Sequence, residues 1–429
     1  MMRLLASVLM LLQCVIVQAD DSPLPDPLTL EFALAQAGAE THHQIIEADA
    51  SLEHARSQVY LGRAANEWQA KLQLQASVLE PSPLAVDQST DEFSTRLHIE
   101  KILYDFGRSE NLQQSADLQQ ASVKAYMPYV LGQRRLEITR LYLAVLLADL
   151  RYTYDNEAMA VAYVQFDNAQ ERFALRQLSD VDMLAAETLY QNALYQRMQS
   201  ESMQRSTRAL LAEIINRPGE LASNLQRPKF FLQRELPEHK QLIEQALANN
   251  LRLQLMQASI DAAQARMLSA QYQARPSLNA AVDVMSSSVD RSSQDDWRAS
   301  LTLNIPLFEL QSVKSQVSSE RSQWQLSRAM LLQEQAHVRQ RILLLWQQIQ
   351  ILNTRLQQMQ TKAEFNELYL DRSRALYDLE VKTDLGDAMV AMSETRYQQA
   401  QVEFDLVLAW MELDLITNAG SDAVIEKGK

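Results

Sequence analysis

Cysteine, glycine and proline are scarce in this chain of 429 residues. It has one cysteine, 8 glycines and 11 prolines, and alanine, leucine, glutamine, glutamate and arginine are abundant. Glycine and proline interrupt helices and form tight turns, so their scarcity together with this bias is typical of long helices rather than of compact domains. The only cysteine is Cys14, which excludes an internal disulfide framework. Stability must therefore come from packing or from oligomerisation.

Long apolar runs are also absent after the N-terminus. Residues 4–17 are apolar and follow Arg3, but this run is too short and wrongly flanked for a membrane-spanning helix. We expect residues 1–19 to be a secretory signal peptide that ends at a small-residue cleavage site. Lipidation at Cys14 is the less favoured alternative, because Gln13 stands where a small residue would be needed.

Signatures of catalysis and of nucleic-acid binding are missing. The formal net charge is -14 and the charges are spread evenly, which argues against a nucleic-acid partner. There is no glycine-rich phosphate loop, no GxSxG motif and no HExxH motif. His43 and His54 share a helix face but lie too far apart for one metal ion. The 16 methionines favour core filling over a copper route. We expect no enzyme, no cofactor and no bound metal.

The pattern of secondary structure occurs twice along the chain. Each copy predicts a helix, a β-hairpin, a long helix, a short polar knee and a second long helix, which indicates an internal duplication. The first copy spans residues 20–217, with a helix from Thr29 to about Asn66, a hairpin at 68–102 and a long helix pair at 105–217. The second spans 237–420, with a helix to about Gln273, a hairpin at 277–305 and a helix pair at 307–419; residues 218–236 connect the copies, and 421–429 form a tail.

The long helices carry apolar residues at heptad spacing, and in both copies the pattern predicts an uninterrupted helix of more than sixty residues before the knee. Such helices would be on the order of 100 Å long. Stripes of this kind require partner helices that pack knobs-into-holes. The stripes are Val338, Ile342, Leu345, Ile349, Leu352, Leu356 and Met359; Leu143, Leu147, Leu150 and Tyr154; and Val402, Leu406, Ala409, Leu413 and Ile416.

The predicted strands alternate between apolar and polar residues, as in Leu72, Leu74, Ala76 and Val78. An isolated hairpin is marginal in water, whereas a closed transmembrane barrel places apolar residues against lipid and polar residues in a wet lumen. Four strands cannot enclose a lumen, so several chains must each contribute four. The alternative is a small soluble sheet that caps a helical bundle. Aromatic residues on the apolar parity near strand ends are candidate lipid-interface residues: Trp68, Phe93 and Trp297.

Several motifs resemble those of the TolC-like outer-membrane efflux proteins, and the resemblance covers nearly the whole chain after residue 19. The helix starts of the two copies carry Leu103-Tyr104-Asp105-Phe106-Gly107-Arg108 and Pro306-Leu307-Phe308 followed by Val313-Lys314-Ser315-Gln316-Val317. The knees carry Arg172-Phe173 with Asp182, Ala186-Glu187 and Ala193, and Tyr377-Asp378-Leu379 with Thr383 and Leu385.

The resemblance implies a mainly α fold in which a homotrimer forms a twelve-stranded barrel in the outer membrane and a helical coiled-coil tunnel across the periplasm. It implies an exit duct that binds a periplasmic adaptor protein and an inner-membrane pump of the RND, ABC or MFS type. The exported substrates would be drugs, detergents or metal ions. The alternatives are an outlet for type I protein secretion and, from another class, an exported coiled-coil structural or adaptor protein.

The resemblance also suggests site residues at the knees, which are the free ends of the helices. Asp180, Tyr377 and Lys382 match a periplasmic gate, although lysine lacks the bidentate geometry of the arginine usual in the family. Asp384 and Asp387 are candidates for an acidic constriction that favours cations. In both cases ordinary solvated turn residues are the alternative. Arg176 and Glu380 stand where the family usually has a knee glycine, so a turn with positive φ would be strained.

Overall fold

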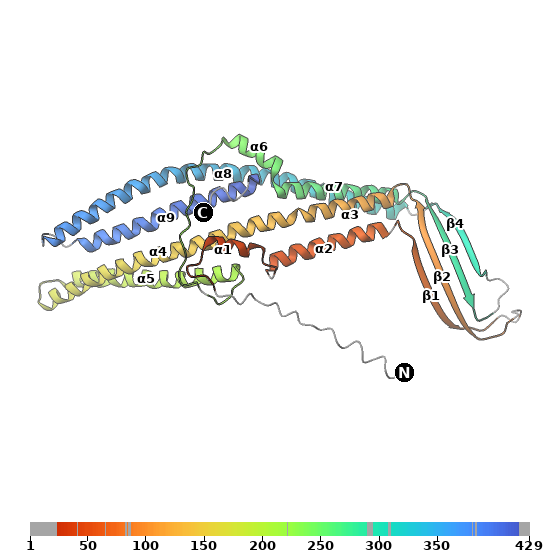
Figure 1. Cartoon of the computed structure of the whole chain (residues 1–429), viewed down its shortest axis with the longest axis horizontal. Helices are drawn as coiled ribbons and strands as arrows, with labels where there is room; N and C mark the ends of the chain where they lie inside the picture. The colour runs from red at the N-terminus through yellow and green to blue at the C-terminus, as the bar shows by residue number, and fades with distance from the viewer. Residues whose placement is uncertain are drawn as a thin grey trace.

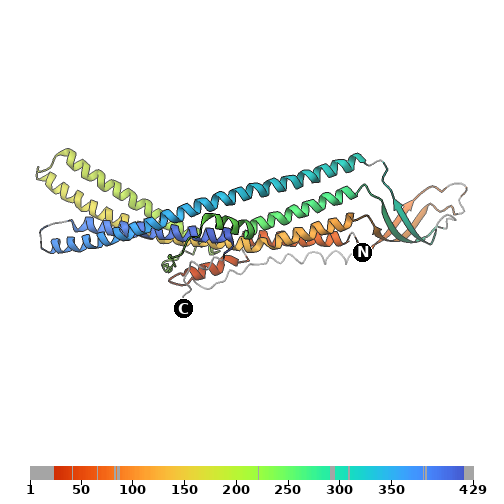
Figure 2. The ribbon, with the colours of Figure 1, turned by 90° about the horizontal axis from the view of Figure 1, so that it is seen from above.

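The computed structural model describes residues 24–40, 42–64, 66–81, 84, 87–220, 222–289, 295–307, 310–379, 381 and 384–419. The predicted signal peptide, the C-terminal tail, Glu380 and Lys382 lie outside these residues. The molecule is a long rod of helices with a sheet at one end and two helical hairpins at the other (Figure 1). The view from above shows the same elongated arrangement (Figure 2).

The described elements follow the duplicated order. The first copy contains α1 (Leu30–Ala35), a short 3-10 turn (Gln36–Gly38), α2 (His43–Ala64), β1 (Gln69–Val78), β2 (Asp91–Tyr104), α3 (Arg108–Lys124), α4 (Tyr126–Ala174) and α5 (Asp180–Ile214). The second contains α6 (His239–Asn249), α7 (Leu251–Tyr272), β3 (Ser277–Ser287), β4 (Trp297–Asn304), α8 (Leu310–Asp378) and α9 (Leu385–Thr417). With 69 residues, α8 is about 100 Å long.

The prediction of an uninterrupted first long helix was wrong. This helix is divided at Ala125 into α3 and α4. Pro128 lies in the first turn of α4, where it has no N–H to donate to the carbonyl of Lys124 and its ring crowds that carbonyl. The corresponding helix of the second copy, α8, contains no proline and runs without a break.

Two further predicted helices are also divided. The helix expected from Thr29 to about Asn66 ends in the 3-10 turn that finishes at Gly38, and α2 begins only at His43. The helix expected to run to Gln273 breaks at Asn250. The side chain of Asn250 caps α7 by accepting from the backbone N–H of Leu253 at 3.1 Å, and its amide donates to the carbonyl of Ile416 at 2.9 Å.

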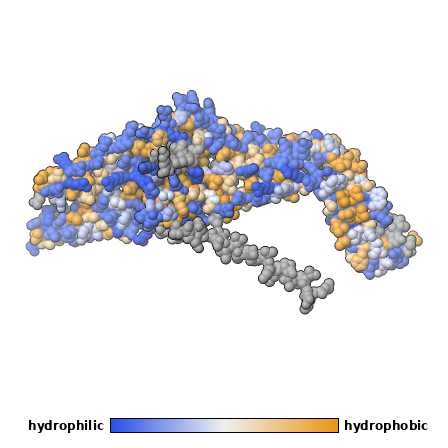
Figure 3. All heavy atoms as spheres, viewed as in Figure 1, coloured by the Kyte–Doolittle hydropathy of each residue, from blue (hydrophilic) through white to orange (hydrophobic). Residues whose placement is uncertain are grey.

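The four strands form one antiparallel sheet in the order β1-β2-β3-β4. Its register places most of the apolar strand residues on one face, for example Leu72 opposite Leu97, Leu97 opposite Val284, and Val284 opposite Trp297. Part of this apolar face is visible on the surface of the sheet (Figure 3). The opposite face carries the polar and charged residues. Strands β1 and β4 form the two edges, and neither has an outer neighbour among the described residues.

The connection from β2 to α3 is a compact turn built around Asp105. The carboxylate of Asp105 accepts from the backbone N–H groups of Gly107 at 3.2 Å and Ser109 at 2.9 Å, which caps the start of α3. Phe106 and Gly107 both have positive φ, of 58° and 91°. The turn redirects the chain from the sheet into the helical rod and explains why the motif combines an aspartate with a glycine.

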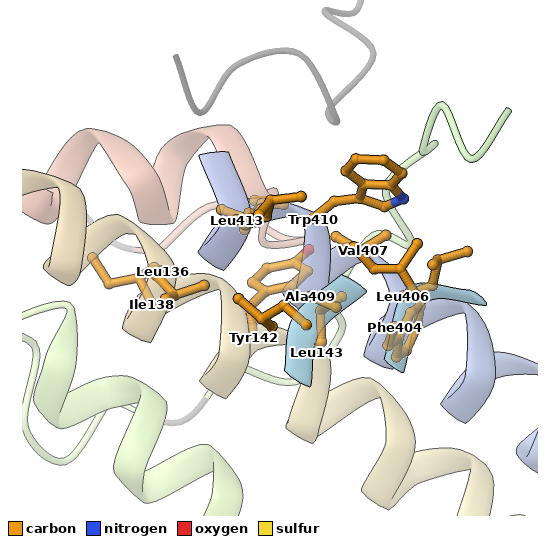
Figure 4. Packing of buried hydrophobic residues seen from close by; sticks show 14 of the residues in the cluster. Leu136, Ile138, Tyr142, Leu143, Phe404, Leu406, Val407, Ala409, Trp410 and Leu413 are labelled. Atoms are coloured by element: carbon orange, nitrogen blue, oxygen red, sulfur yellow. The ribbon is translucent and has the colours of Figure 1, made fainter. Parts of the chain in front are cut away.

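The main hydrophobic core lies halfway along the rod, where α4 packs against α9. Tyr142 and Leu143 of α4 meet Phe404, Leu406 and Trp410 of α9 there (Figure 4). The predicted α8 stripe is buried in the same cluster, from Val338 to Met359. The hydroxyl of Tyr142 donates to the carbonyls of Leu28 at 2.7 Å and Gln226 at 2.6 Å, and burial raises the pKa of Tyr142 above its ordinary value.

Backbone segments outside the long helices wrap this core. Leu28 and Leu225 form a parallel bridge, so the N-terminal segment pairs with the connector between the copies. Further along the connector, Arg234 makes a bidentate ion pair with Asp414 of α9, at 2.7 and 2.6 Å. The guanidinium of Arg234 also lies 4.5 Å from the centroid of the Trp410 ring. These contacts fix the connector to the helices.

Candidate functional site

The first knee joins α4 to α5 and is described in full. Ser179 caps α5 because its hydroxyl accepts from the backbone N–H of Asp182 at 3.1 Å. Asp180 is the first residue of α5 and is exposed to solvent. Arg176 has a φ of 59°, and Gln177 donates to the carbonyl of Arg172 at 2.8 Å, so the helix ends in a Schellman-type turn. Arg176 therefore has a backbone conformation with positive φ, which glycine adopts at the lowest conformational cost.

Replacing Arg176 by glycine is expected to stabilise the first knee by about 1 kcal/mol, because glycine adopts positive φ without the steric cost of a Cβ atom. Hydrogen exchange of the amides around the knee would show slower local opening. As a matched control, Arg172→Gly changes a residue in the last regular turn of α4 and should destabilise the knee by a similar amount. Faster exchange in Arg176→Gly would contradict the strain at this position.

The second knee places three of the predicted site residues around one groove. Tyr377 at the end of α8, together with Asp384 and Asp387 at the start of α9, lines a groove of about 780 Å³. Helix α4 forms the other wall, with Glu157 and Asn168 among its residues. The hydroxyl of Tyr369 donates to Asp384 at 3.2 Å, and Asp387 is exposed. The groove therefore combines an aromatic ring with carboxylates from two helical hairpins.

The structure does not bring the proposed gate residues together within one chain. Asp180 lies at the tip of the α4–α5 hairpin, whereas Tyr377 lies near the end of α8 in the other hairpin, and no hydrogen bond between them occurs among the described residues. Lys382 lies outside the described residues. Gly386 of α9 lies against α4. A Cβ atom there would approach Val161 to 2.9 Å, so this position serves the close approach of α9 to α4.

Two helices present apolar residues that have no partner in a single chain. Helices α4 and α9 contact each other, so α5 and α8 form the two outer sides of the four-helix segment (Figure 1). Exposed apolar residues recur at heptad spacing along both outer helices. They are Leu344, Ile351 and Phe365 on α8, and Val181, Leu184, Tyr195 and Met198 on α5. On α8, the sequence pattern predicted the buried stripe but not this exposed one.

Exposed aromatic residues mark both ends of the sheet. Trp68 precedes β1 near the helices, Phe93 lies near the far end of the sheet, and Trp297 begins β4; Phe93 and Trp297 are on the apolar face. Tyr104 was not among the aromatic residues that the sequence predicted at the lipid interface. A bulge between Ile102 and Tyr104 places Tyr104 opposite Leu278 and therefore on the apolar face as well. The strand length from Trp68 to Ala76, which is opposite Phe93, is about 27 Å, at about 3.4 Å per residue.

Comparison with known proteins relates part of the chain to one family. Residues 242–419, which contain nearly all of the second copy, match the model of the outer membrane efflux protein family. The match covers less than half of the chain. The structural resemblance extends beyond this region and covers both copies. No curated protein matches the sequence of this chain.

Three solved structures illustrate the shared fold. The outer membrane protein VceC of Vibrio cholerae is 15% identical with a TM-score of 0.69, over 90% of this chain and 95% of VceC. The outer membrane channel CmeC of Campylobacter jejuni is 10% identical with a TM-score of 0.74, over 93% and 87%. The open state of the Neisseria gonorrhoeae channel MtrE is 16% identical with a TM-score of 0.63, over 92% and 89%.

These findings confirm the predicted family and the mainly helical fold class with its four-stranded sheet. They also confirm the expected location in the outer membrane.

No described helix combines the length and the apolar character that are needed to cross a bilayer. Among the same residues, no group of three or more histidine, cysteine, aspartate or glutamate side chains is arranged to hold a metal ion.

Proposed function

We propose that three copies of this chain form an exit duct that carries small molecules from a periplasmic adaptor and an inner-membrane pump to the outside. The observation that supports this most strongly is the sheet, which has one apolar face and two free edges in the described residues. The unpaired backbone groups of the two edges gain hydrogen-bond partners when β4 of one copy pairs with β1 of the next. The apolar face of the sheet then contacts lipid. Three copies give a barrel of twelve strands.

The unpartnered helix stripes support the same assembly. Leu344, Ile351 and Phe365 on α8 are exposed on one outer side of the chain, and Leu184 and Tyr195 on α5 are exposed on the other. In a ring of copies, α8 of one chain lies beside α5 of the next, so each stripe gains the partner that heptad packing requires. The helices then enclose a continuous tunnel below the barrel. The protein conducts rather than catalyses.

The same assembly gives the gate residues a way to meet. Tyr377 at the end of α8 and Asp180 at the start of α5 lie on the two outer helices, so a ring places them on adjoining subunits. Three such contacts around the axis, with Lys382 as a third member, would hold the helical ends closed. Asp384 and Asp387 of the three copies would make the constriction attractive to cations. Contact with the adaptor would open the tip.

Planar-bilayer recordings with the purified protein test the proposal. We expect a detergent-stable trimer that forms cation-selective channels, and we expect Tyr377→Phe combined with Lys382→Ala to raise the single-channel conductance. A protein that stays monomeric and water-soluble without detergent would contradict the proposal. Susceptibility of a deletion strain to drugs and detergents tests the substrate class, and loss of secreted proteins instead would favour the type I secretion outlet.

A further inference from the structure

The polar face of the sheet carries one row of ionisable residues that crosses all four strands. Lys71 of β1 pairs with His98 of β2, His98 pairs with Asp283 of β3, and Asp283 pairs with Arg298 of β4. Because paired residues of an antiparallel sheet lie at the same level, the four side chains form a single line across the strands. We call this line the charge row.

His98 lies at the centre of the charge row between two carboxylates. Its Nδ1 atom is 2.8 Å from the Oδ1 atom of Asp283, and its Nε2 atom is 3.5 Å from the Oε2 atom of Glu100. A neutral imidazole has only one N–H, so only the imidazolium offers a proton to both carboxylates. The side chains of His98 and Asp283 are each about one third exposed, at 34% and 31%, which leaves them accessible to water and ions.

The formal charges of the groups around His98 sum to zero when His98 itself is not counted. The charged groups that face it are Lys71 on β1, Asp283 on β3, and Arg96 and Glu100 on its own strand. One strand further, Arg298 lies near Asp295, with its Nε atom 3.0 Å from the Oδ2 atom of Asp295. Three positive and three negative groups therefore surround His98. The protonation state of His98 decides whether this level of the sheet is neutral or positive.

We propose that the charge row forms a selectivity ring inside the barrel, in which His98 sets the preference between cations and anions. This inference depends on the proposed trimeric channel, because only closure of the sheet turns the polar face into a lumen. The row then occurs three times around the wall, at a level far from the acidic groups of the helical tip. Loss of the His98 proton removes three positive charges from the ring, and uptake restores them.

Reversal potentials of the whole protein in planar bilayers test the ring. We expect the cation-to-anion permeability ratio of the wild type to be lower at about pH 5 than at about pH 9, by about twofold or more. His98→Gln should remove this dependence on pH because glutamine carries no charge. His54→Gln is the matched control, since His54 is an exposed histidine of α2 outside the sheet, and it should behave like the wild type.

A second variant keeps the test decisive if His98→Gln does not assemble. Asp283→Asn removes one negative charge from each row, and it should lower the cation-to-anion permeability ratio at both pH values. Channels that keep the wild-type dependence on pH in His98→Gln, or keep the wild-type ratio in Asp283→Asn, overturn the selectivity ring and leave the proposed duct intact. Absence of any conductance from the wild-type protein overturns the duct and the ring together.

Discussion

Replacing Leu301 by arginine is expected to abolish stable insertion of the protein into the outer membrane. Leu301 is 70% exposed on the apolar face of the edge strand β4, where the proposed barrel contacts lipid. An arginine at the middle of the lipid face of a barrel costs about 2–4 kcal/mol, and the proposed assembly incurs this cost in each of three subunits. Membrane fractionation and the yield of trimer on non-denaturing gels would show the loss.

The neighbouring residue provides a matched control. Thr302 is opposite Asn279 on the polar face, so Thr302→Arg introduces the same side chain at nearly the same depth but into the lumen. This variant should insert and assemble, with a changed conductance. Equal tolerance of both substitutions would show that the apolar face does not contact lipid and would favour the soluble structural or adaptor protein instead.

Arg234→Ala is expected to lower the free energy of unfolding by about 3–5 kcal/mol, because it leaves a buried carboxylate without its partner. The side chain of Asp414 is 1% exposed and depends on the bidentate contact with Arg234. The substitution also removes the cation–π contact with Trp410. Denaturant unfolding in detergent, followed by tryptophan fluorescence, would measure the effect.

Two further variants distinguish the cost of the unpaired Asp414 carboxylate from a nonspecific loss of stability. Replacing both partners, with Arg234→Met and Asp414→Leu, removes the uncompensated charge and should recover much of the lost stability. Arg56→Ala breaks an exposed ion pair with Glu53 on α2 and should stay within about 1 kcal/mol of the wild type. A single variant Arg234→Ala as stable as the wild type would show that the connector contributes little to the fold.

Much of the architecture follows from short-range patterns in the sequence. Heptad spacing identified the buried stripe from Val338 to Met359, and period-two alternation identified the strands and the face that each residue occupies. These patterns are readable because packing against a helix or across a sheet imposes a fixed period. The three helix breaks were missed although each carried a local signal, namely Gly38, Pro128 and Asn250.

The candidate site was less accessible to sequence reasoning. Motif similarity located Asp180 and Tyr377 at the two knees but gave no information on their distance, which depends on how hairpins and subunits pack. The position of Tyr104 depends on a bulge, and the charge row around His98 depends on strand register across 185 positions of the sequence. The register between two strands that lie so far apart in the sequence cannot be predicted from the apolar period of either strand alone.

The order of the strands also constrains when the sheet can form. The central contact joins β2 of the first copy to β3 of the second, although β2 ends at Tyr104 and β3 begins only at Ser277. Closing such a long loop is slow. Until the second hairpin pairs with it, the first hairpin therefore keeps β2 as an unpaired edge beside its exposed apolar face. Holdase chaperones of the cell envelope are expected to bind this intermediate and keep it from aggregating.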